Sequence, residues 1–179
     1  MKKERKGLII VHTGNGKGKT TAAMGMALRG VGHGLKILMI QFIKGTWKYG
    51  ELKAAHKLYP NFELIPMGKG FIGFKNGGGP APKDRKAVYD AWEFSKESIG
   101  SNNYDMIIFD EINTALSYGM LDLDDVLQAI VTKPERLHVV LTGRNAHSKI
   151  IDIADLVTEM KEIKHPYKKG IKAQKGIEF

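Results

Sequence analysis

Residues 13–21 read Thr-Gly-Asn-Gly-Lys-Gly-Lys-Thr-Thr, and their types and spacing suit the binding of a phosphate chain. Glycines allow backbone N–H groups to converge on an anion, and a helix that starts near Lys19 would add the positive end of its dipole. The ammonium of Lys19 would contact the phosphates, and the hydroxyl of Thr20 would ligate Mg²⁺. This segment therefore predicts a site for a nucleoside polyphosphate.

The segment departs in two ways from the common pattern G-x-x-x-x-G-K-T. Thr13 holds the place of the first glycine, with Gly14 after it, and Lys17 is an additional cation. A glycine-rich turn that caps a helix and binds nothing is the alternative interpretation. The apolar run 8–11 before the loop and the helix-forming residues 22–24 after it favour a phosphate loop. The residues expected to hold the phosphates are Gly14, Asn15, Gly16, Lys17, Gly18, Lys19, Thr20 and Thr21.

Two acids end a second apolar run, at residues 106–109. Asp110 and Glu111 follow it directly. Carboxylates at the end of a strand can hold Mg²⁺ directly or through its water shell, completing a site that Thr20 begins. Acidic residues are also common at helix N-termini because of the helix dipole. Asp110 and Glu111 therefore indicate a metal site mainly in combination with the phosphate loop. The combination predicts a metal site of Thr20, Asp110 and Glu111 for Mg²⁺, with Mn²⁺ as an alternative ion.

Arg144 follows a third apolar run, 137–142. A guanidinium group matches phosphate oxygens in a bidentate manner, so Arg144 is a candidate phosphate ligand. The residues alone leave an ordinary surface arginine equally open. The six histidines show no metal-ligand spacing, and Trp47 and Trp92 are expected to be packing residues.

A glycine-rich stretch, residues 67–82, carries the apolar residues Phe71, Ile72 and Phe74. Such a loop cannot easily bury these side chains by itself. Either it folds onto the core of the domain, or it offers an apolar surface to a large ligand. The sequence does not decide between the two.

Apolar runs alternate with helical patterns along the whole chain, which predicts an α/β fold with a mostly parallel sheet and helices on both faces. In such sheets ligands bind beyond the carboxyl ends of the strands, where the three candidate segments would meet. The fold class is thus a P-loop, RecA-like nucleotide-binding architecture. Strands are predicted at 8–12, 35–42, 62–66, 104–110, 137–142 and 156–163, and helices at 19–32, 50–58, 83–99, 114–118, 123–132 and 148–154.

Size and composition favour one domain over residues 1–179, with a short basic segment at 1–6 and a basic tail at 164–179. The chain has no cysteine, which excludes disulfides, thiolate metal sites and a cysteine nucleophile. No apolar run approaches the roughly 20 residues that span a bilayer, and the N-terminus does not resemble a signal peptide. We therefore expect a cytoplasmic protein without a membrane partner.

The net charge of +9 invites a nucleic-acid interpretation, but its distribution argues against one. Residues 1–6 carry +3 and residues 160–179 carry +4, so the long middle of the chain is nearly balanced. Basic ends are common solubilising features. Alternatively, the lysines of the tail help to hold a polyanionic ligand.

Together these segments resemble the ATP:corrinoid adenosyltransferases of bacterial cobalamin synthesis and salvage. The similarity extends from Gly7 to Phe179, and the ending is telling because no generic nucleotide-binding pattern requires it. The most specific pieces are residues 13–21, Gln41-Phe42-Ile43-Lys44-Gly45, Met67-Gly68 through Gly70-Phe71, Asp110-Glu111, Thr142-Gly143-Arg144, Lys164-His165, Gly170 and residues 173–177.

The resemblance implies that a Co(I) corrinoid attacks the ribose 5′-carbon of ATP, forming a cobalt–carbon bond and releasing tripolyphosphate. ATP would lie across the phosphate loop in the reverse of the usual sense. Residues 14–20 would hold the phosphates, and Thr20 and Glu111, with Asp110 close by, would handle Mg²⁺. The catalytic residues are then expected to be Lys19, Glu111 and Phe71.

The family also places aromatic side chains beneath the cobalt, which removes its lower axial ligand and eases reduction to Co(I). Phe71 matches one of these aromatics. A tryptophan expected two residues later is replaced by Gly73, and Phe74 beside it is a candidate substitute. The resemblance further implies a homodimer and a reducing flavoprotein partner. Relatives with a longer N-terminal segment use it to help cover the site, and about six residues precede the first strand here.

Two other functions are alternatives to this one. A plain P-loop ATPase or small-molecule kinase would employ Lys19, Thr20, Asp110 and Glu111 but would cleave at the γ-phosphate. A non-catalytic nucleic-acid-binding protein with a nucleotide switch would use the basic ends. No interleaving of aromatic and basic residues supports the second function.

Overall fold

The computed structural model describes residues 6–45, 49–70 and 79–177. Short apolar runs form six strands, and β1, β2 and β4 are buried along their whole length. This is expected of parallel strands that are covered on both faces. The strands are β1 (Ile9–Thr13), β2 (Ile37–Gln41), β3 (Phe62–Pro66), β4 (Met106–Asp110), β5 (His138–Thr142) and β6 (Leu156–Glu159).

The six strands form one sheet in the order β3-β2-β4-β5-β1-β6, and every neighbouring pair is parallel. Parallel strands bring their carboxyl ends to one edge of the sheet, so the segments that follow β1, β2, β4 and β5 lie at the same edge. The register pairs Gln41 at the end of β2 with Asp110 at the end of β4. The predicted α/β class with a parallel sheet is confirmed.

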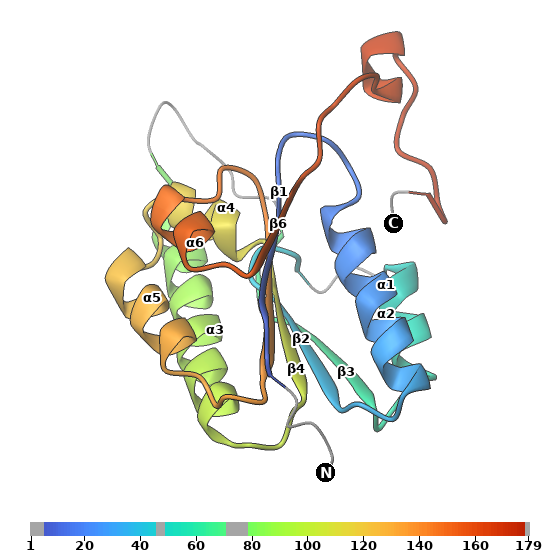
Figure 1. Cartoon of the computed structure of the whole chain (residues 1–179). Helices are drawn as coiled ribbons and strands as arrows, with labels where there is room; N and C mark the ends of the chain where they lie inside the picture. The colour runs from blue at the N-terminus through green and yellow to red at the C-terminus, as the bar shows by residue number, and fades with distance from the viewer. Residues whose placement is uncertain (1–5, 46–48, 71–78, 178–179) are drawn as a thin grey trace.

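Helices cover both faces of the sheet (Figure 1). Helices α1 (Lys19–Gly32) and α2 (Gly50–His56) lie on one face. The other face is covered by α3 (Pro82–Gly100), α4 (Ile112–Ser117), α5 (Leu123–Val131) and α6 (Ser148–Asp152). The chain passes from β1 into α1 through the glycine-rich segment, and this crossover places the predicted phosphate loop at the carboxyl edge.

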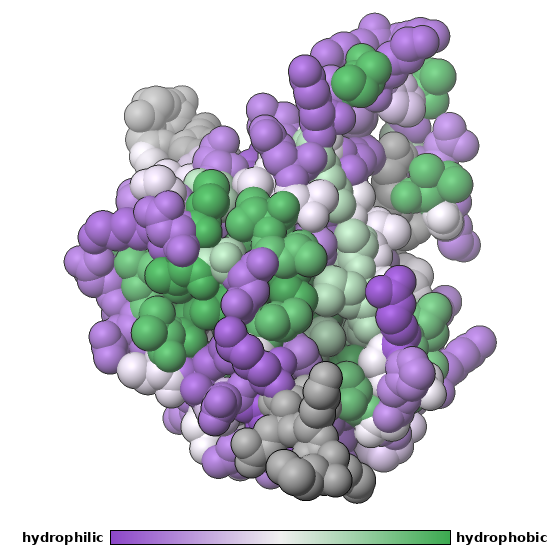
Figure 2. Space-filling view, in the orientation of Figure 1, coloured by the Kyte–Doolittle hydropathy of each residue, from purple (hydrophilic) through white to green (hydrophobic). Residues whose placement is uncertain are grey.

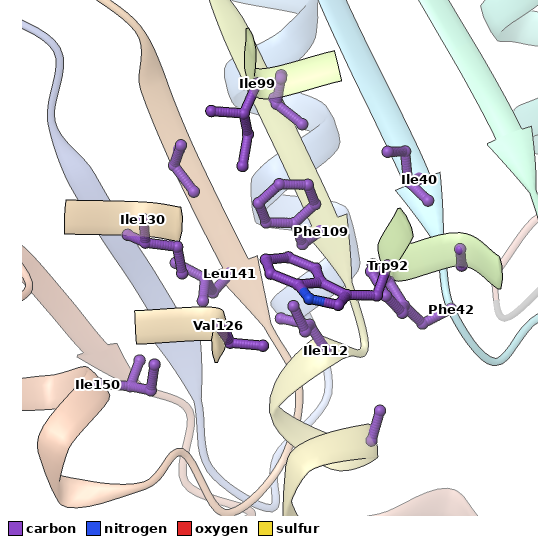
Figure 3. Close-up of a cluster of buried hydrophobic side chains, with 14 of the residues drawn as sticks. Ile40, Phe42, Trp92, Ile99, Phe109, Ile112, Val126, Ile130, Leu141 and Ile150 are labelled. Carbon is purple, nitrogen blue, oxygen red and sulfur yellow. The ribbon is translucent and has the colours of Figure 1, made fainter. Parts of the chain in front are cut away.

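Each face of the sheet has its own cluster of buried apolar side chains. Figure 3 shows the larger one, in which Trp92 of α3 packs edge-on against Phe109 of β4 with a ring-centroid distance of 6.0 Å. Phe109 in turn meets Phe42 at 6.1 Å. The prediction that Trp92 is a packing residue is confirmed, and its Nε1 also donates a hydrogen bond to Asp125 on α5 at 2.7 Å.

The last strand is shorter than predicted. β6 ends at Glu159, whereas the sequence predicts a strand over 156–163. Its partner β1 turns into the phosphate loop after Thr13, so the chain beyond Glu159 has no strand to pair with. Instead the N–H of Gly16 donates to the carbonyl of Met160 at 2.6 Å. The end of β6 therefore supports the loop.

Beyond Met160 the chain leaves the sheet as an arm, residues 161–177, that contains the short 3₁₀ helix η1 (Pro166–Lys169). Hydrophilic residues cover most of the arm, which extends from the body of the molecule (Figure 2). The sequence does not predict η1. Across residues 6–45, 49–70 and 79–177, no helix is long and apolar enough to cross a membrane.

Candidate functional site

The phosphate loop, residues 14–21, curls between β1 and the first turn of α1. Gly14 and Gly18 adopt positive φ values of 94° and 109°, which L-residues with a side chain rarely adopt. A Cβ atom on Gly14 would also lie 2.5 Å from the carbonyl oxygen of Met160. Gly14, which stands one place later than the first glycine of the common pattern, is therefore required for two reasons: its positive φ and the close approach of Met160.

Lys19 lies inside this curl. Its side-chain Nζ donates to the carbonyls of Gly14 and Gly16 at 2.8 and 2.7 Å. Burial lowers the pKa of Lys19, and Arg144 adds to that effect, while Glu111 and Asp110 oppose it. A buried cation held in a ring of backbone groups is suited to receive a phosphate.

Asp110 is completely buried and accepts hydrogen bonds from three different elements. Its Oδ1 accepts from the hydroxyls of Thr20 at 2.8 Å and Thr142 at 2.7 Å. Its Oδ2 accepts from Nε2 of Gln41 at 3.0 Å. The carboxylate therefore fixes Thr20 of α1 relative to the ends of β2, β4 and β5.

Glu111 follows Asp110 in a left-handed backbone conformation, with φ of 67°. Such a conformation is uncommon for a residue with a side chain and is concentrated at functional sites. The N–H of Glu111 donates to the Thr142 hydroxyl at 2.9 Å, and its carboxylate accepts from the hydroxyl of Thr114. Burial raises the pKa of Glu111, although the Thr114 bond and nearby cations lower it.

A cavity of about 620 Å³ opens over these groups. It brings together Lys19, Thr20, Glu111 and Arg144, as the sequence predicts, whereas Asp110 lies behind it in the core. Gly14 is not part of its wall, and Phe71 and Phe74 lie outside the described residues. The wall consists of Asn15, Gly16, Lys17, Gly18, Lys19, Thr20, Thr21, Met24, Lys44, Gly50, Glu51, Glu111, Arg144, His165, Gly176 and Ile177.

The sequence assigns no individual role to part of this wall. Lys44 and Glu51 lie near β2 and α2, and they form an ion pair of 2.8 Å. The position of Lys44 three residues after a buried strand, at the same edge as Asp110, was an available signal. Ile177 belongs to the segment 173–177 that carries the family resemblance, whereas Met160 offers no signal, because its approach depends on β6 lying beside β1.

The backbone around Lys44 is packed against the segment 68–70. The N–H of Gly70 donates to the carbonyl of Ile43 at 3.0 Å. A Cβ atom on Gly68 would lie 2.1 Å from that same carbonyl oxygen. We call residues 43–45, 49–51 and 68–70 the β2 rim of the cavity.

The oxygen donors of the site suit a hard divalent cation. Thr20 supplies a hydroxyl, Glu111 faces the cavity, and Asp110 is close enough to orient the Thr20 hydroxyl. Among the described residues, no three His, Cys, Asp or Glu side chains gather as a cation site. An ion bound here would thus need phosphate oxygens or water to complete its coordination.

Comparisons with known proteins agree with this geometry. Residues 5–179 match the family described as ATP:corrinoid adenosyltransferase BtuR/CobO/CobP. A corrinoid adenosyltransferase of Sinorhizobium sp is 44% identical over 180 residues, covering 99% of this chain and 83% of the relative. The corrinoid adenosyltransferase of Escherichia coli K12 is 39% identical over 176 residues, covering 98% and 87%.

A solved structure shares the fold at low identity. The flagellar accessory protein FlaH from Methanocaldococcus jannaschii superimposes with a TM-score of 0.58 and 13% identity, covering 87% of this chain and 71% of that one. At this identity the likeness concerns the fold alone.

Proposed function

The chain belongs to the ATP:corrinoid adenosyltransferase family, and from this premise we propose how its site performs ATP-dependent transfer of an adenosyl group to a corrinoid. The activity belongs to cobalamin synthesis or salvage. The observation that carries the proposal is the cavity in which the phosphate loop, Thr20, Glu111 and Arg144 meet. Its chemistry is that of a site for a nucleoside triphosphate.

We propose that the reacting bond is the one between the ribose 5′-carbon and the phosphate chain. The Co(I) centre donates its electron pair to the carbon, the cobalt–carbon bond forms, and the carbon–oxygen bond breaks with its pair on the departing oxygen. Tripolyphosphate is then the leaving group. Because cobalt is the nucleophile, the protein needs to supply positioning and charge neutralisation, which suits Lys17, Lys19 and Arg144 in the cavity wall.

Mg²⁺, with Mn²⁺ as an alternative, would be held by the Thr20 hydroxyl and the Glu111 carboxylate together with phosphate oxygens. Asp110 would act through Thr20, from whose hydroxyl it accepts a hydrogen bond, or through the water shell of the ion. When bound, such an ion neutralises phosphate charge. Glu111 must be ionised for this role, and its burial makes that ionisation sensitive to pH.

Phe71 and Phe74 would contact the corrinoid. The support for this role is positional: residue 71 directly follows Gly70, which is fixed to the β2 rim by its bond to Ile43. In this proposal Phe71 lies beneath the cobalt. Phe74 takes over the role of the tryptophan that is expected at position 73, where this chain has Gly73. An aromatic face there would displace the lower axial ligand and make reduction to Co(I) easier.

Several wider expectations remain part of the proposal. We expect a homodimer, a flavoprotein as the source of electrons, a cytoplasmic location, and no nucleic-acid or membrane partner. The family assignment supports the first two, and the near-neutral middle of the chain supports the absence of a nucleic-acid partner.

The products of ATP test this function against that of an ATPase or kinase. The parent protein, given ATP, Mg²⁺ and a pre-reduced corrinoid, should release tripolyphosphate with little orthophosphate. Of the two carboxylates in the described wall of the cavity, Glu51 is paired with Lys44 and Glu111 would be occupied by the ion, so neither is free to orient a water at the γ-phosphate. Stoichiometric ADP and phosphate, separated by ion-exchange chromatography, would support the ATPase instead.

A further inference from the structure

Lys44 is the one cation in the cavity wall that lies on the β2 side, away from the phosphate loop, among the residues that the structure describes. Two strands, β4 and β5, separate β2 from β1 in the sheet. At about 4.8 Å per strand, the ends of β1 and β2 are roughly 14 Å apart. Lys19 and Lys44 therefore approach the cavity from opposite sides, and a triphosphate held by Lys19 would have room to extend toward Lys44.

The side chain of Lys44 is held in a defined place. Its Nζ lies 2.8 Å from Oε1 of Glu51, and its ammonium lies 5.2 Å from the ring centroid of Tyr49. Both members of the ion pair are largely buried, with 25% and 17% of their side chains exposed. Burial lowers the pKa of Lys44, but Asp110 and Glu51 raise it more, so the group is a persistent cation.

The backbone of Lys44 is equally fixed, and it is fixed to the segment that leads toward Phe71. Ile43 accepts the hydrogen bond of Gly70, and a Cβ atom on Gly45 would lie 2.8 Å from the nitrogen of Gly70. Lys44 thus lines the nucleotide cavity, and its two neighbours contact Gly70, the residue before the stretch that the proposed function assigns to the corrinoid. If the proposed function holds, the reacting carbon is presented to cobalt near Gly70.

We propose that Lys44 is a catalytic residue that neutralises the phosphate oxygen from which the ribose 5′-carbon departs. The cobalt–carbon bond forms as the carbon–oxygen bond breaks, and the electron pair of the broken bond stays on that oxygen. A fixed ammonium beside it stabilises this charge more in the transition state than in bound ATP. Glu51 acts through Lys44 and is a positioning residue. This assignment rests on the proposed function.

The absence of cysteine from the chain permits a direct test. In Lys44→Cys the new thiol is the only one, so treatment with 2-bromoethylamine restores an ammonium at the position of the lysine. Treatment with iodoacetamide adds a neutral group of similar size. The rate is measured with corrinoid already reduced to Co(I), which separates this step from reduction, and thermal unfolding confirms that each form is folded.

Lys44→Cys should lower kcat on the order of 10²–10³-fold with a much smaller change in KM for ATP, as loss of one charge-stabilising group does. Aminoethylation should restore most of kcat, and carbamidomethylation should not. Glu51→Gln should lower kcat less. Lys53→Ala, on the exposed side of α2 and outside the cavity wall, is the matched control and should behave as the parent.

A kcat of Lys44→Cys close to that of an active parent would overturn the role of Lys44 alone. So would a defect confined to KM for ATP, or equal rescue by the neutral reagent. If the parent itself forms no alkylcorrinoid from ATP, the proposed function fails, and the role of Lys44 fails with it.

Discussion

The phosphate loop and the β2 rim line the same cavity but are held by different kinds of contact. Behind the phosphate loop, the buried Asp110 carboxylate accepts side-chain hydrogen bonds from Thr20, Thr142 and Gln41. The β2 rim contains the Lys44–Glu51 ion pair, but its segments 43–45 and 68–70 meet through their backbones, where Gly68 approaches Ile43 too closely for a side chain. The support behind the phosphate loop is a network of side chains, whereas the contact between segments 43–45 and 68–70 requires that Gly68 carries no side chain.

This difference predicts different consequences of substitution. A change at a lysine of the phosphate loop should remove charge that the reaction needs and leave the fold intact. A change at Gly68 in the β2 rim should shift backbone, and it should reach the reaction through the segment that follows Gly70. The predictions below are arranged from the largest expected effect to the smallest.

Lys19→Ala should lower turnover on the order of 10²–10³-fold, because the variant loses phosphate charge stabilisation inside the loop. The measurement is the rate of alkylcorrinoid formation from pre-reduced corrinoid at saturating ATP. Lys17→Ala is the comparison within the same loop, and its effect should be smaller because Lys17 is exposed whereas Lys19 is buried. Full activity of Lys19→Ala would remove the phosphate loop from the mechanism.

Phe71→Ala should lower turnover at least about tenfold when the assay starts from Co(II) and a weak biological reductant, a loss that corresponds to roughly 1.4 kcal/mol. Turnover from pre-reduced Co(I) should be much less affected, since the aromatic face is then unnecessary. Phe74→Ala tests whether that side chain substitutes for the missing tryptophan.

The spectrum of bound Co(II) corrinoid provides the control for these two variants. The parent should show a four-coordinate species, and Phe71→Ala should show less of it. If Phe71 instead packs in the core, its replacement should cost roughly 3–5 kcal/mol of stability and impair every activity alike. An unchanged amount of the four-coordinate species in both variants would place the aromatic face elsewhere.

Gly68→Ala should destabilise the protein by about 1–3 kcal/mol, the range for overpacking a well-packed site, because the new Cβ would meet the carbonyl of Ile43 at 2.1 Å. ATP binding at the phosphate loop should be largely retained. Gly25→Ala is the matched control: its Cβ has no neighbour within 4 Å, and alanine in helix α1 should be neutral or stabilising. Equal stability of both variants in urea unfolding would argue against a rigid β2 rim.

The pH dependence of stability should report on Glu111, and this effect should be the smallest. Burial raises the folded-state pKa of Glu111 above its ordinary value of 4.5, so the folded protein binds the proton more tightly than the unfolded chain. This tighter proton binding adds to the unfolding free energy below pH 4.5. The added stability is lost as the pH rises through the folded-state pKa, at no more than about 1.4 kcal/mol per pH unit.

Glu111→Gln provides the test of that titration. Without divalent cations, the parent should lose this part of its unfolding free energy as the pH rises, and the variant should not. Identical pH profiles for the two proteins would contradict the raised pKa. In the assay, extra Mg²⁺ should partly rescue the variant if the carboxylate binds the ion.

Much of the phosphate half follows from local sequence patterns. An apolar run, a glycine-rich loop and a helix that starts at Lys19 predict a phosphate loop, and the parallel sheet brings Asp110, Glu111 and Arg144 to it. The left-handed backbone conformation of Glu111 could not be predicted, because nothing in an Asp-Glu pair specifies a positive φ.

The supporting contacts depend on strand order, which local patterns do not specify. Met160 supports Gly16 because β6 lies beside β1, and Gly68 meets Ile43 because β3 lies beside β2. The two residues of each pair are far apart in the sequence. In addition, a glycine that permits close approach of two backbones cannot be distinguished in the sequence from a glycine in any other loop. The predicted end of β6 at residue 163 is wrong for the same reason. The residues 156–163 themselves do not indicate that the neighbouring strand β1 ends at Thr13 and leaves β6 without a partner beyond Glu159.

The most direct test of the central claim is a single reaction followed by two readouts. Parent protein is mixed with ATP, Mg²⁺ and chemically reduced cobalamin, and the corrinoid spectrum and the phosphate products are recorded together. We expect a light-sensitive alkylcobalamin to form in a one-to-one ratio with tripolyphosphate. An unchanged corrinoid spectrum accompanied by ADP and orthophosphate would contradict the account.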